Sequence, residues 1–342
     1  IELMRMQEKG VPTIEKYLME TLQDREVFGF DGNCVSAKQG EKLEKACRER
    51  GAGIRCDRDL ADIAWKGRPA LPSEPVWELP EEYAGESCGD KLEEVRRVME
   101  KEGADYLFLS ALDDIMWLFN LRGGDIACNP VALSYAFIGK ESCTLFLQKK
   151  AAPDLSLERF GVEIEEYGTL FEWIDRKFVD KDAGDGGRNN AGNPAKITAS
   201  GAFLSYRLRQ VLSGKSELVL KESPTELLKA IKNGTELSRI RETYERDSAA
   251  LCKFIYWLKT RVGKEEITEL SAADKLEGYR RQLPGFLDLS FTTICGYAEN
   301  GAIVHYAADE KSNRRLCAKG MVLVDSGGQY MGGTTDVTRT IV

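Results

Sequence analysis

The strongest constraint on this chain is its C-terminal stretch, residues 321–342, which reads as two strands joined by a glycine-rich turn. Apolar and β-branched residues fill both arms, and glycines mark the reversal. An antiparallel hairpin centred between Tyr330 and Met331 places Asp325 opposite Asp336. Directly opposed side chains have Cβ atoms about 4.5–5.5 Å apart, and like charges at that distance are destabilising. The pattern therefore predicts two carboxylates that share a cation or a proton.

Each aspartate also has a simpler explanation. Asp325 precedes Ser-Gly-Gly and could start a turn, while Asp336 lies among threonines and could sit on a solvated strand face. The opposed register favours the metal interpretation. Aspartate oxygens suit hard divalent ions, and Mn²⁺ fits a carboxylate-rich site better than zinc. Two such ions could hold one hydroxide and polarise a peptide carbonyl.

Composition limits the classes of function. A net charge of −8 argues against a nucleic-acid partner or an anionic membrane. No apolar run reaches the length needed to span a bilayer. The nine cysteines are scattered without a C-x-x-C pair, which is typical of free thiols in a reducing compartment. We therefore expect a cytoplasmic protein. Hydrophobic residues make up 42% of the chain, which is enough to form hydrophobic cores.

The chain divides into three predicted domains, at residues 1–76, 77–222 and 223–342. A proline-rich connector ends the first, and alternating strands and helices predict α/β layering. Helices are predicted at 14–22, 38–50, 91–101, 225–232, 236–261 and 269–281, and strands at 27–30, 106–109, 291–294 and 302–306. The segment 181–193, rich in Gly, Asn and Asp, predicts a surface loop.

Several motifs carry a family resemblance. They are Leu112–Gly123, Glu222–Pro224, Gly296–Tyr306, Asp325–Tyr330 and Thr334–Thr340. In order and spacing they resemble the Xaa-Pro aminopeptidases (aminopeptidase P), metallopeptidases with a pita-bread catalytic domain. The resemblance implies two creatinase/prolidase-like N-terminal domains, the first incomplete, followed by the first half of a pita-bread domain. Both ends look interrupted, so we expect a fragment that lacks the C-terminal half of the catalytic domain.

The resemblance also implies a dinuclear metal site. Asp325 matches a ligand of one metal, and Asp336 matches a bridging ligand. In such proteins one His and two Glu complete the site, and these ligands and a glutamate general base lie downstream of Val342. With two of these ligands, the chain alone is expected to bind metal weakly and to have no peptidase activity. It is also expected to aggregate readily.

His305 is the only histidine of the chain. A lone histidine on an apolar strand is more often a packed or surface residue than a catalyst. In the resemblance His305 falls near the bound substrate, outside the metal sphere. An imidazole there could donate a hydrogen bond to the scissile carbonyl or to the tetrahedral intermediate.

Three further residues have candidate roles. Trp117 and Arg122 belong either to a strand–turn core or to a wall of the substrate cleft, which related enzymes complete across a dimer interface. Arg339 lies on the strand face opposite Asp336 by alternation. We expect it to make a structural ion pair beside the metal ligands and to have no catalytic role.

The leading hypothesis is a metalloaminopeptidase that uses two divalent ions, with Mn²⁺ favoured. It would release the N-terminal residue from peptides with proline at the second position, and it is expected to be a homodimer. One alternative is a prolidase- or creatinase-type hydrolase. Another is a non-catalytic relative that binds peptides. Both aspartates argue against that last alternative.

Overall fold

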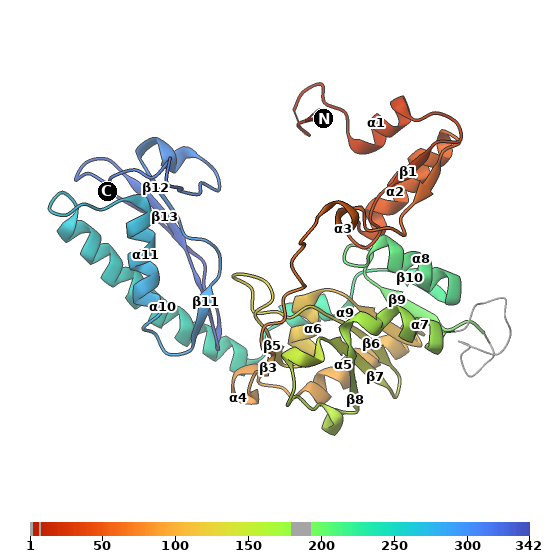
Figure 1. Cartoon of the computed structure of the whole chain (residues 1–342). Helices are drawn as coiled ribbons and strands as arrows, with labels where there is room; N and C mark the ends of the chain where they lie inside the picture. The colour runs from red at the N-terminus through yellow and green to blue at the C-terminus, as the bar shows by residue number, and fades with distance from the viewer. Residues whose placement is uncertain (1–2, 7, 179–192) are drawn as a thin grey trace. The chain divides into compact units, whose positions relative to one another are not determined.

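The computed structural model describes residues 3–6, 8–178 and 193–342 (Figure 1). The chain forms two compact units that interleave along the sequence. Unit 1 comprises Ile1–Pro72, Gly89–Leu118 and Leu133–Lys229, and unit 2 comprises Ser73–Cys88, Phe119–Ala132 and Ala230–Val342. The predicted boundaries at 76 and 222 stay predictions. The predicted loop at 181–193 lies, except for Asn193, outside the described residues.

Unit 1 is built on a six-stranded mixed sheet. In spatial order its strands are β10 (Glu217–Leu220), β9 (Lys196–Ala199), β4 (Tyr106–Leu109), β6 (Ser134–Gly139), β7 (Cys143–Leu147) and β8 (Val162–Glu166). The associated helices are α5 (Cys88–Lys101), α6 (Leu112–Leu118), α7 (Leu170–Lys177), α8 (Tyr206–Lys215) and α9 (Pro224–Ala230), with short 3₁₀ turns η1 (Lys149–Ala151), η2 (Glu158–Phe160) and η3 (Tyr167–Thr169). Phe108, Phe137, Phe146 and Phe178 are buried in its core. The predicted α/β class is confirmed.

Residues 8–72 form a smaller α/β motif of the same unit. Its elements are α1 (Ile14–Thr21), β1 (Val27–Gly29), α2 (Ala37–Glu49), β2 (Gly53–Arg55) and α3 (Leu60–Ala64). The hydroxyl of Thr13 accepts a hydrogen bond from the Lys16 amide and caps the N-terminus of α1. Gly40 lets α2 pack on α8, because a Cβ there would lie 2.2 Å from a ring carbon of Tyr206.

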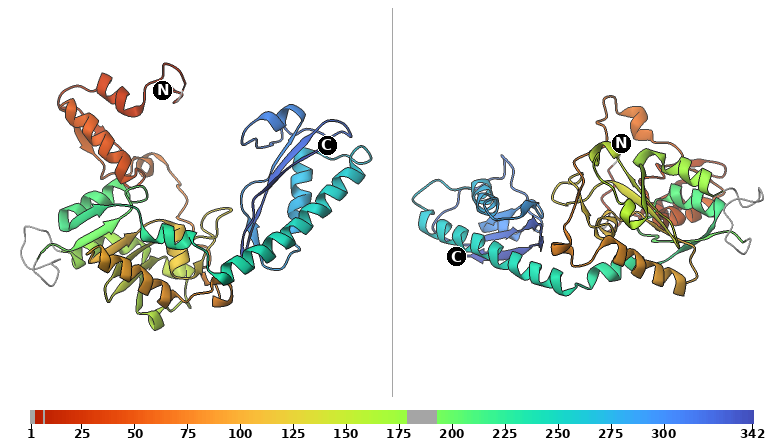
Figure 2. Two further views of the ribbon diagram at one scale, coloured as in Figure 1. Left: turned by 180° about the vertical axis from the view of Figure 1, so that it is seen from behind. Right: turned by 90° about the horizontal axis from the view of Figure 1, so that it is seen from below.

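Unit 2 contains two long helices and two small sheets. The helices are α10 (Gly234–Arg261) and α11 (Glu269–Arg280); one sheet contains β12 (Ile294–Tyr297), β13 (Val322–Ser326) and β16 (Val337–Ile341), and the other β11 (Phe286–Leu289), β14 (Gly328–Tyr330) and β15 (Gly333–Thr334). A short helix α4 (Glu81–Ala84) and an antiparallel pair, β3 (Trp77–Glu78) with β5 (Leu121–Arg122), complete the unit. Figure 2 shows both long helices beside the strands.

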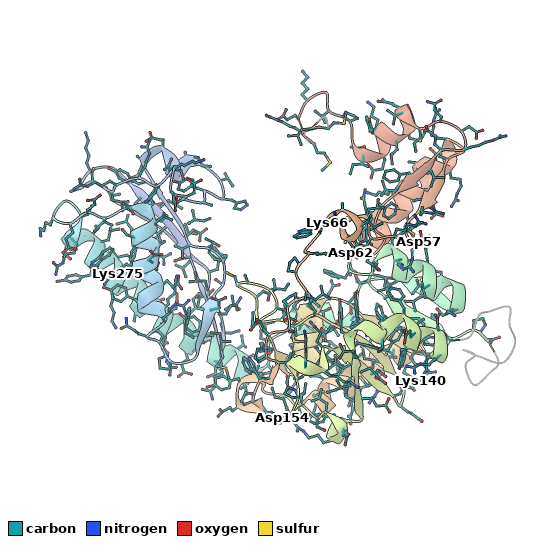
Figure 3. The ribbon with its side chains drawn as sticks, viewed as in Figure 1. Asp57, Asp62, Lys66, Lys140, Asp154 and Lys275 are labelled. Atoms are coloured by element: carbon teal, nitrogen blue, oxygen red, sulfur yellow. The ribbon has the colours of Figure 1, made fainter. Side chains whose placement is uncertain are left out.

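The core of unit 2 lies between these helices and one face of the β12–β13–β16 sheet. Phe254, Leu276, Cys295 and Val324 are buried together there. Lys275 of α11, labelled in Figure 3, adds a contact between the helices. Its ammonium lies 5.6 Å from the ring centroid of Trp257 on α10, a distance typical of a cation–π contact.

Two predicted strands are wrong. The segment 291–294 lies almost wholly before β12, and 302–306 contains the end of the 3₁₀ helix η4 (Ala298–Ala302) and a turn. The apolar residues Ile303 and Val304 led to the prediction of a strand at 302–306. In the structure both side chains are exposed at the turn. The turn is stabilised instead by polar contacts of its neighbours, which the local pattern does not reveal.

A buried ion pair joins the elements of unit 2. Arg280 on α11 donates from Nε to Oδ1 of Asp247 on α10 at 2.7 Å, and from Nη2 to Oδ2 at 3.1 Å. Both side chains are 0% exposed. The hydroxyl of Tyr330 on β14 donates to the same Oδ1 at 2.6 Å. Burial, together with the bond to Asp247, raises the pKa of Tyr330, so this phenol stays a neutral donor.

Replacing Arg280 by Met should lower the free energy of unfolding of unit 2 by about 3–5 kcal/mol, because Asp247 is then left buried without its cation. Urea unfolding followed by circular dichroism, with hydrogen exchange of α11 as the regional readout, measures this loss. Arg281→Met is the matched control, because the neighbouring Arg281 pairs with Glu277 at an exposed site. Equal effects of the two substitutions would contradict the prediction.

Candidate metal site

The C-terminal hairpin has a different register from the predicted one. Asp325 pairs with Thr338, and Tyr330 pairs with Gly333, which shifts the predicted register by two residues. The turn is therefore formed by Met331 and Gly332. A Cβ on Gly332 would lie 2.8 Å from Oγ1 of Thr243 on α10, so close packing against α10 favours glycine at this position. The predicted direct opposition of the two aspartates is wrong.

The shift still keeps the two carboxylates near each other. Side chains alternate with a period of two, so a two-residue shift leaves Asp325 and Asp336 on the same face in the register count. Asp336 lies in the break between β15 and β16, and the count places it opposite Gly327. Diagonal neighbours of this kind lie about 7–8 Å apart, which relieves the direct charge repulsion of opposed carboxylates.

The environment of Asp325 fits a metal ligand. The residue is half-buried on the sheet face opposite that of Val324, which packs against the helices. Its Oδ1 is buried and, among the described residues, has no hydrogen-bond partner. A buried carboxylate oxygen without a donor is costly unless a cation binds it. Asp336 is exposed and therefore accessible to the same cation.

The ligand set within the described residues is incomplete. No group of three or more His, Cys, Asp and Glu residues in the described part of the chain is placed to share an ion. Two carboxylates alone hold a divalent ion weakly, because such ions take four to eight ligands. The two aspartates would therefore supply only part of a metal site.

His305 lies in an exposed turn of unit 2 that follows η4. Its backbone φ is +52°, in the left-handed region that non-glycine residues adopt rarely. The next residue, Tyr306, is buried, and its hydroxyl donates to Oε2 of Glu269 at 2.8 Å. The loop leaves β12, whose Ile294 pairs directly with Asp325 on β13. His305 and the carboxylates thus belong to one unit, and the loop of His305 follows a strand that pairs with β13.

The other predicted site residues fall into different surroundings. Trp117 is half-buried on α6 of unit 1, with the ammonium of Lys91 4.6 Å from its ring centroid. Arg122 is half-buried on β5 of unit 2, where desolvation lowers the pKa of its guanidinium despite the attraction of Glu236. The segment is a helix followed by a short strand, so the strand–turn description is wrong.

Arg339 pairs with Val324 across the sheet and is exposed. Its Nη1 donates to the carbonyl of Thr338 at 2.7 Å. Val324 lies on the face opposite that of Asp325, in accord with the alternation that places Arg339 away from the carboxylates. Its structural ion pair stays a prediction.

Sequence reasoning missed one buried polar cluster of this unit. Glu269, Asn300 and Tyr306 are all buried and hydrogen-bonded to one another. A signal was present, since Asn300 and Tyr306 both belong to the motif that contains His305. The contribution of Glu269, from the start of α11, is visible only in three dimensions.

The α/β fold and the paired carboxylates are typical of a metallohydrolase. Residues 67–236 match the creatinase/prolidase N-terminal domain, and residues 238–342 match metallopeptidase family M24. The chain thus contains a creatinase/prolidase N-terminal domain followed by a metallopeptidase family M24 domain. The family resemblance seen in the motifs is thereby confirmed.

Individual relatives agree with this assignment. Xaa-Pro aminopeptidase 1 of Dictyostelium discoideum is 34% identical over 99% of this chain and 54% of that protein. The crystal structure of X-prolyl aminopeptidase from Caenorhabditis elegans, described as a cytosolic enzyme with a di-nuclear active site, superposes with a TM-score of 0.89 at 31% identity, over 99% of this chain and 55% of that one. The prolidase of Pyrococcus horikoshii shares the fold, with a TM-score of 0.56 at 21% identity, over 74% of this chain and 65% of that one.

The chain spans about half the length of the curated relatives it matches. Within the described residues, no helix is both long enough and apolar enough to cross a membrane.

Replacing Asp325 by Asn should leave the free energy of unfolding within about 1 kcal/mol of the parent, or raise it, in metal-free solution. The carboxylate oxygen has no donor to lose, and the change removes its charge from the vicinity of Asp336. Thermal and urea unfolding in the presence of a chelator measure the difference. A loss of several kcal/mol would show that Asp325 has a structural partner.

Proposed function

We propose that these residues belong to a metal-dependent aminopeptidase that removes the N-terminal residue of peptides with proline at the second position. The observation that carries the proposal is the buried, unpartnered Oδ1 of Asp325 beside the accessible Asp336. Family membership supports the reaction class, and the names of the relatives support the preference for proline. The cytosolic relative supports a cytosolic location.

Asp325 and Asp336 are the proposed metal ligands in this chain, Asp325 for one ion and Asp336 as the bridge between two. Carboxylate oxygens favour a hard divalent ion, and we propose Mn²⁺. When bound, such ions supply an activated water and polarise a carbonyl. The remaining ligands are proposed to be a His and two Glu from polypeptide outside these 342 residues.

His305 is proposed to donate a hydrogen bond to the substrate carbonyl as charge develops on its oxygen. Its exposure leaves the imidazole accessible to a peptide. Trp117 and Arg122 are proposed to contact the substrate, and Arg339 to support the site. We propose a homodimer, with neither nucleic acid nor membrane as a partner.

The function is tested with peptides that differ only at the second residue. The gene product that contains these residues, loaded with Mn²⁺, should hydrolyse an Xaa-Pro-Yaa peptide and spare the Xaa-Ala-Yaa analogue. The 342-residue chain alone should hydrolyse neither. Cleavage of Xaa-Pro dipeptides only would favour a prolidase, and binding without cleavage would favour a non-catalytic relative.

Metal binding to the chain itself is a separate prediction. Asp325→Asn and Asp336→Asn should each weaken Mn²⁺ binding at least about tenfold, because each removes a charged ligand. Titration followed by the electron paramagnetic resonance of free Mn²⁺ measures the affinity. Asp274→Asn, at an exposed position of α11, is the control and should bind like the parent. Equal affinities of all four proteins would contradict the assignment.

His305→Ala should lower kcat of the active gene product by about 10²–10³-fold, the loss typical of one transition-state hydrogen-bond donor. Its metal content should be unchanged, because His305 is proposed to lie outside the metal sphere. Steady-state kinetics and metal analysis of the same preparations test both parts. Loss of metal would instead make His305 a ligand.

A further inference from the structure

We infer that Glu269 is a positioning residue for His305, holding the loop that carries the imidazole through Tyr306. The significance of this role for catalysis rests on the proposed function, but the contacts that define it do not. Glu269 is the first residue of α11 and is 0% exposed. It lies 36 positions before His305 in the sequence, so the connection arises only from the fold.

Four donor groups bind this carboxylate. Oε1 accepts from the amide of Tyr297 at 2.7 Å, and Oε2 accepts from the hydroxyl of Tyr306 at 2.8 Å and from the amide of Arg314 at 2.9 Å. Nδ2 of Asn300 reaches both oxygens, at 3.1 and 3.2 Å. The donors come from the end of β12, from η4, from the turn and from the segment beyond it. One carboxylate therefore binds the chain at four points before and after His305.

The carboxylate form suits this role. Among the ion pairs of the described residues none involves Glu269, so neutral donors and the N-terminus of α11 stabilise its charge. Each of these bonds is made to a buried, charged acceptor, a class worth about twice a neutral hydrogen bond. An apolar or amide side chain at 269 cannot satisfy all four donors at once.

Tyr306 transmits the restraint to His305. The two residues are adjacent, and the Tyr306 amide also donates to the carbonyl of Ile303 at 3.2 Å, which closes the turn around His305. With Tyr306 fixed on one side and Asn300 on the other, the exposed His305 keeps its left-handed backbone. A catalytic hydrogen-bond donor needs such a rigid support, because a loosely held group loses most of its effect.

The single histidine makes this inference directly measurable. The ring Cε1–H resonance of His305 is the only one of its kind in the chain and reports its surroundings whether or not the protein has peptidase activity. Spectra are recorded at a pH of about 9, above the range in which an imidazole titrates, so that protonation does not contribute. The variants are Tyr306→Phe, which removes one hydroxyl, and Glu269→Gln, which keeps the shape.

In both variants the His305 resonance should move toward that of an unfolded peptide and narrow as the turn gains mobility. Exchange of the Tyr306 amide should become faster by about tenfold or more, the effect expected for loss of one bond to a buried carboxylate. Glu299→Gln is the matched control. Glu299 lies in the same loop, but it is exposed and pairs with Arg314 at the surface. The His305 resonance of this variant should therefore match that of the parent.

A parental His305 resonance in folded Tyr306→Phe and Glu269→Gln would overturn the inference, even if both variants melt at lower temperature. If Glu269→Gln does not fold, Tyr306→Phe alone decides. The outcome is separable from that of the proposed function. If the variants shift the His305 resonance but the parent gene product has no peptidase activity, the positioning role stands and the proposed function is rejected. If the gene product is active but the variants leave the resonance unshifted, the proposed function stands and the positioning role is rejected.

Discussion

Unit 2 depends on the buried contact of Asp247 with Arg280. A charge in an apolar core costs several kcal/mol unless it is paired and hydrogen-bonded, so α10 and α11 can pack stably only where the two side chains meet. Tyr330 adds β14 to this contact and places the strand end next to α10. The turn at Met331 and Gly332 must then lie against α10, which sets the hairpin register and, with it, the separation of Asp325 from Asp336.

This dependence explains what the sequence could and could not predict. The two long helices of unit 2 and strand β4 were predicted to within a few residues, because their apolar spacing and caps are local. The hairpin register was not, because it depends on Asp247, which lies 83 positions before Tyr330. The strand predicted at 302–306 failed for a similar reason, since Glu269 and not the apolar pair at 303–304 determines that turn. Of the site, the residue types and the neighbourhood of the two aspartates could be predicted, but their exact pairing could not.

The two kinds of candidate site residue lie on different structural elements, a strand and a loop. Asp325 lies on a strand whose opposite face is packed against helices. This packed strand leaves little freedom to the carboxylate. His305 lies on a loop that has no sheet pairing, and the fold compensates with a dense polar anchor one residue away. A rigid sheet suits a metal ligand, which needs fixed geometry, whereas a restrained loop suits a group that must contact an entering substrate.

Glu269 and Asp325 differ in how well their carboxylates are satisfied by hydrogen bonds. Both belong to unit 2 and both have buried oxygens, but Glu269 accepts from four donor groups while Oδ1 of Asp325 accepts from none among the described residues. Folding alone accounts for a satisfied carboxylate, because its hydrogen bonds offset its desolvation. An unsatisfied carboxylate oxygen keeps its desolvation cost, and a bound cation would offset that cost. The contrast in hydrogen-bond satisfaction supports the proposed role of Asp325 as a metal ligand.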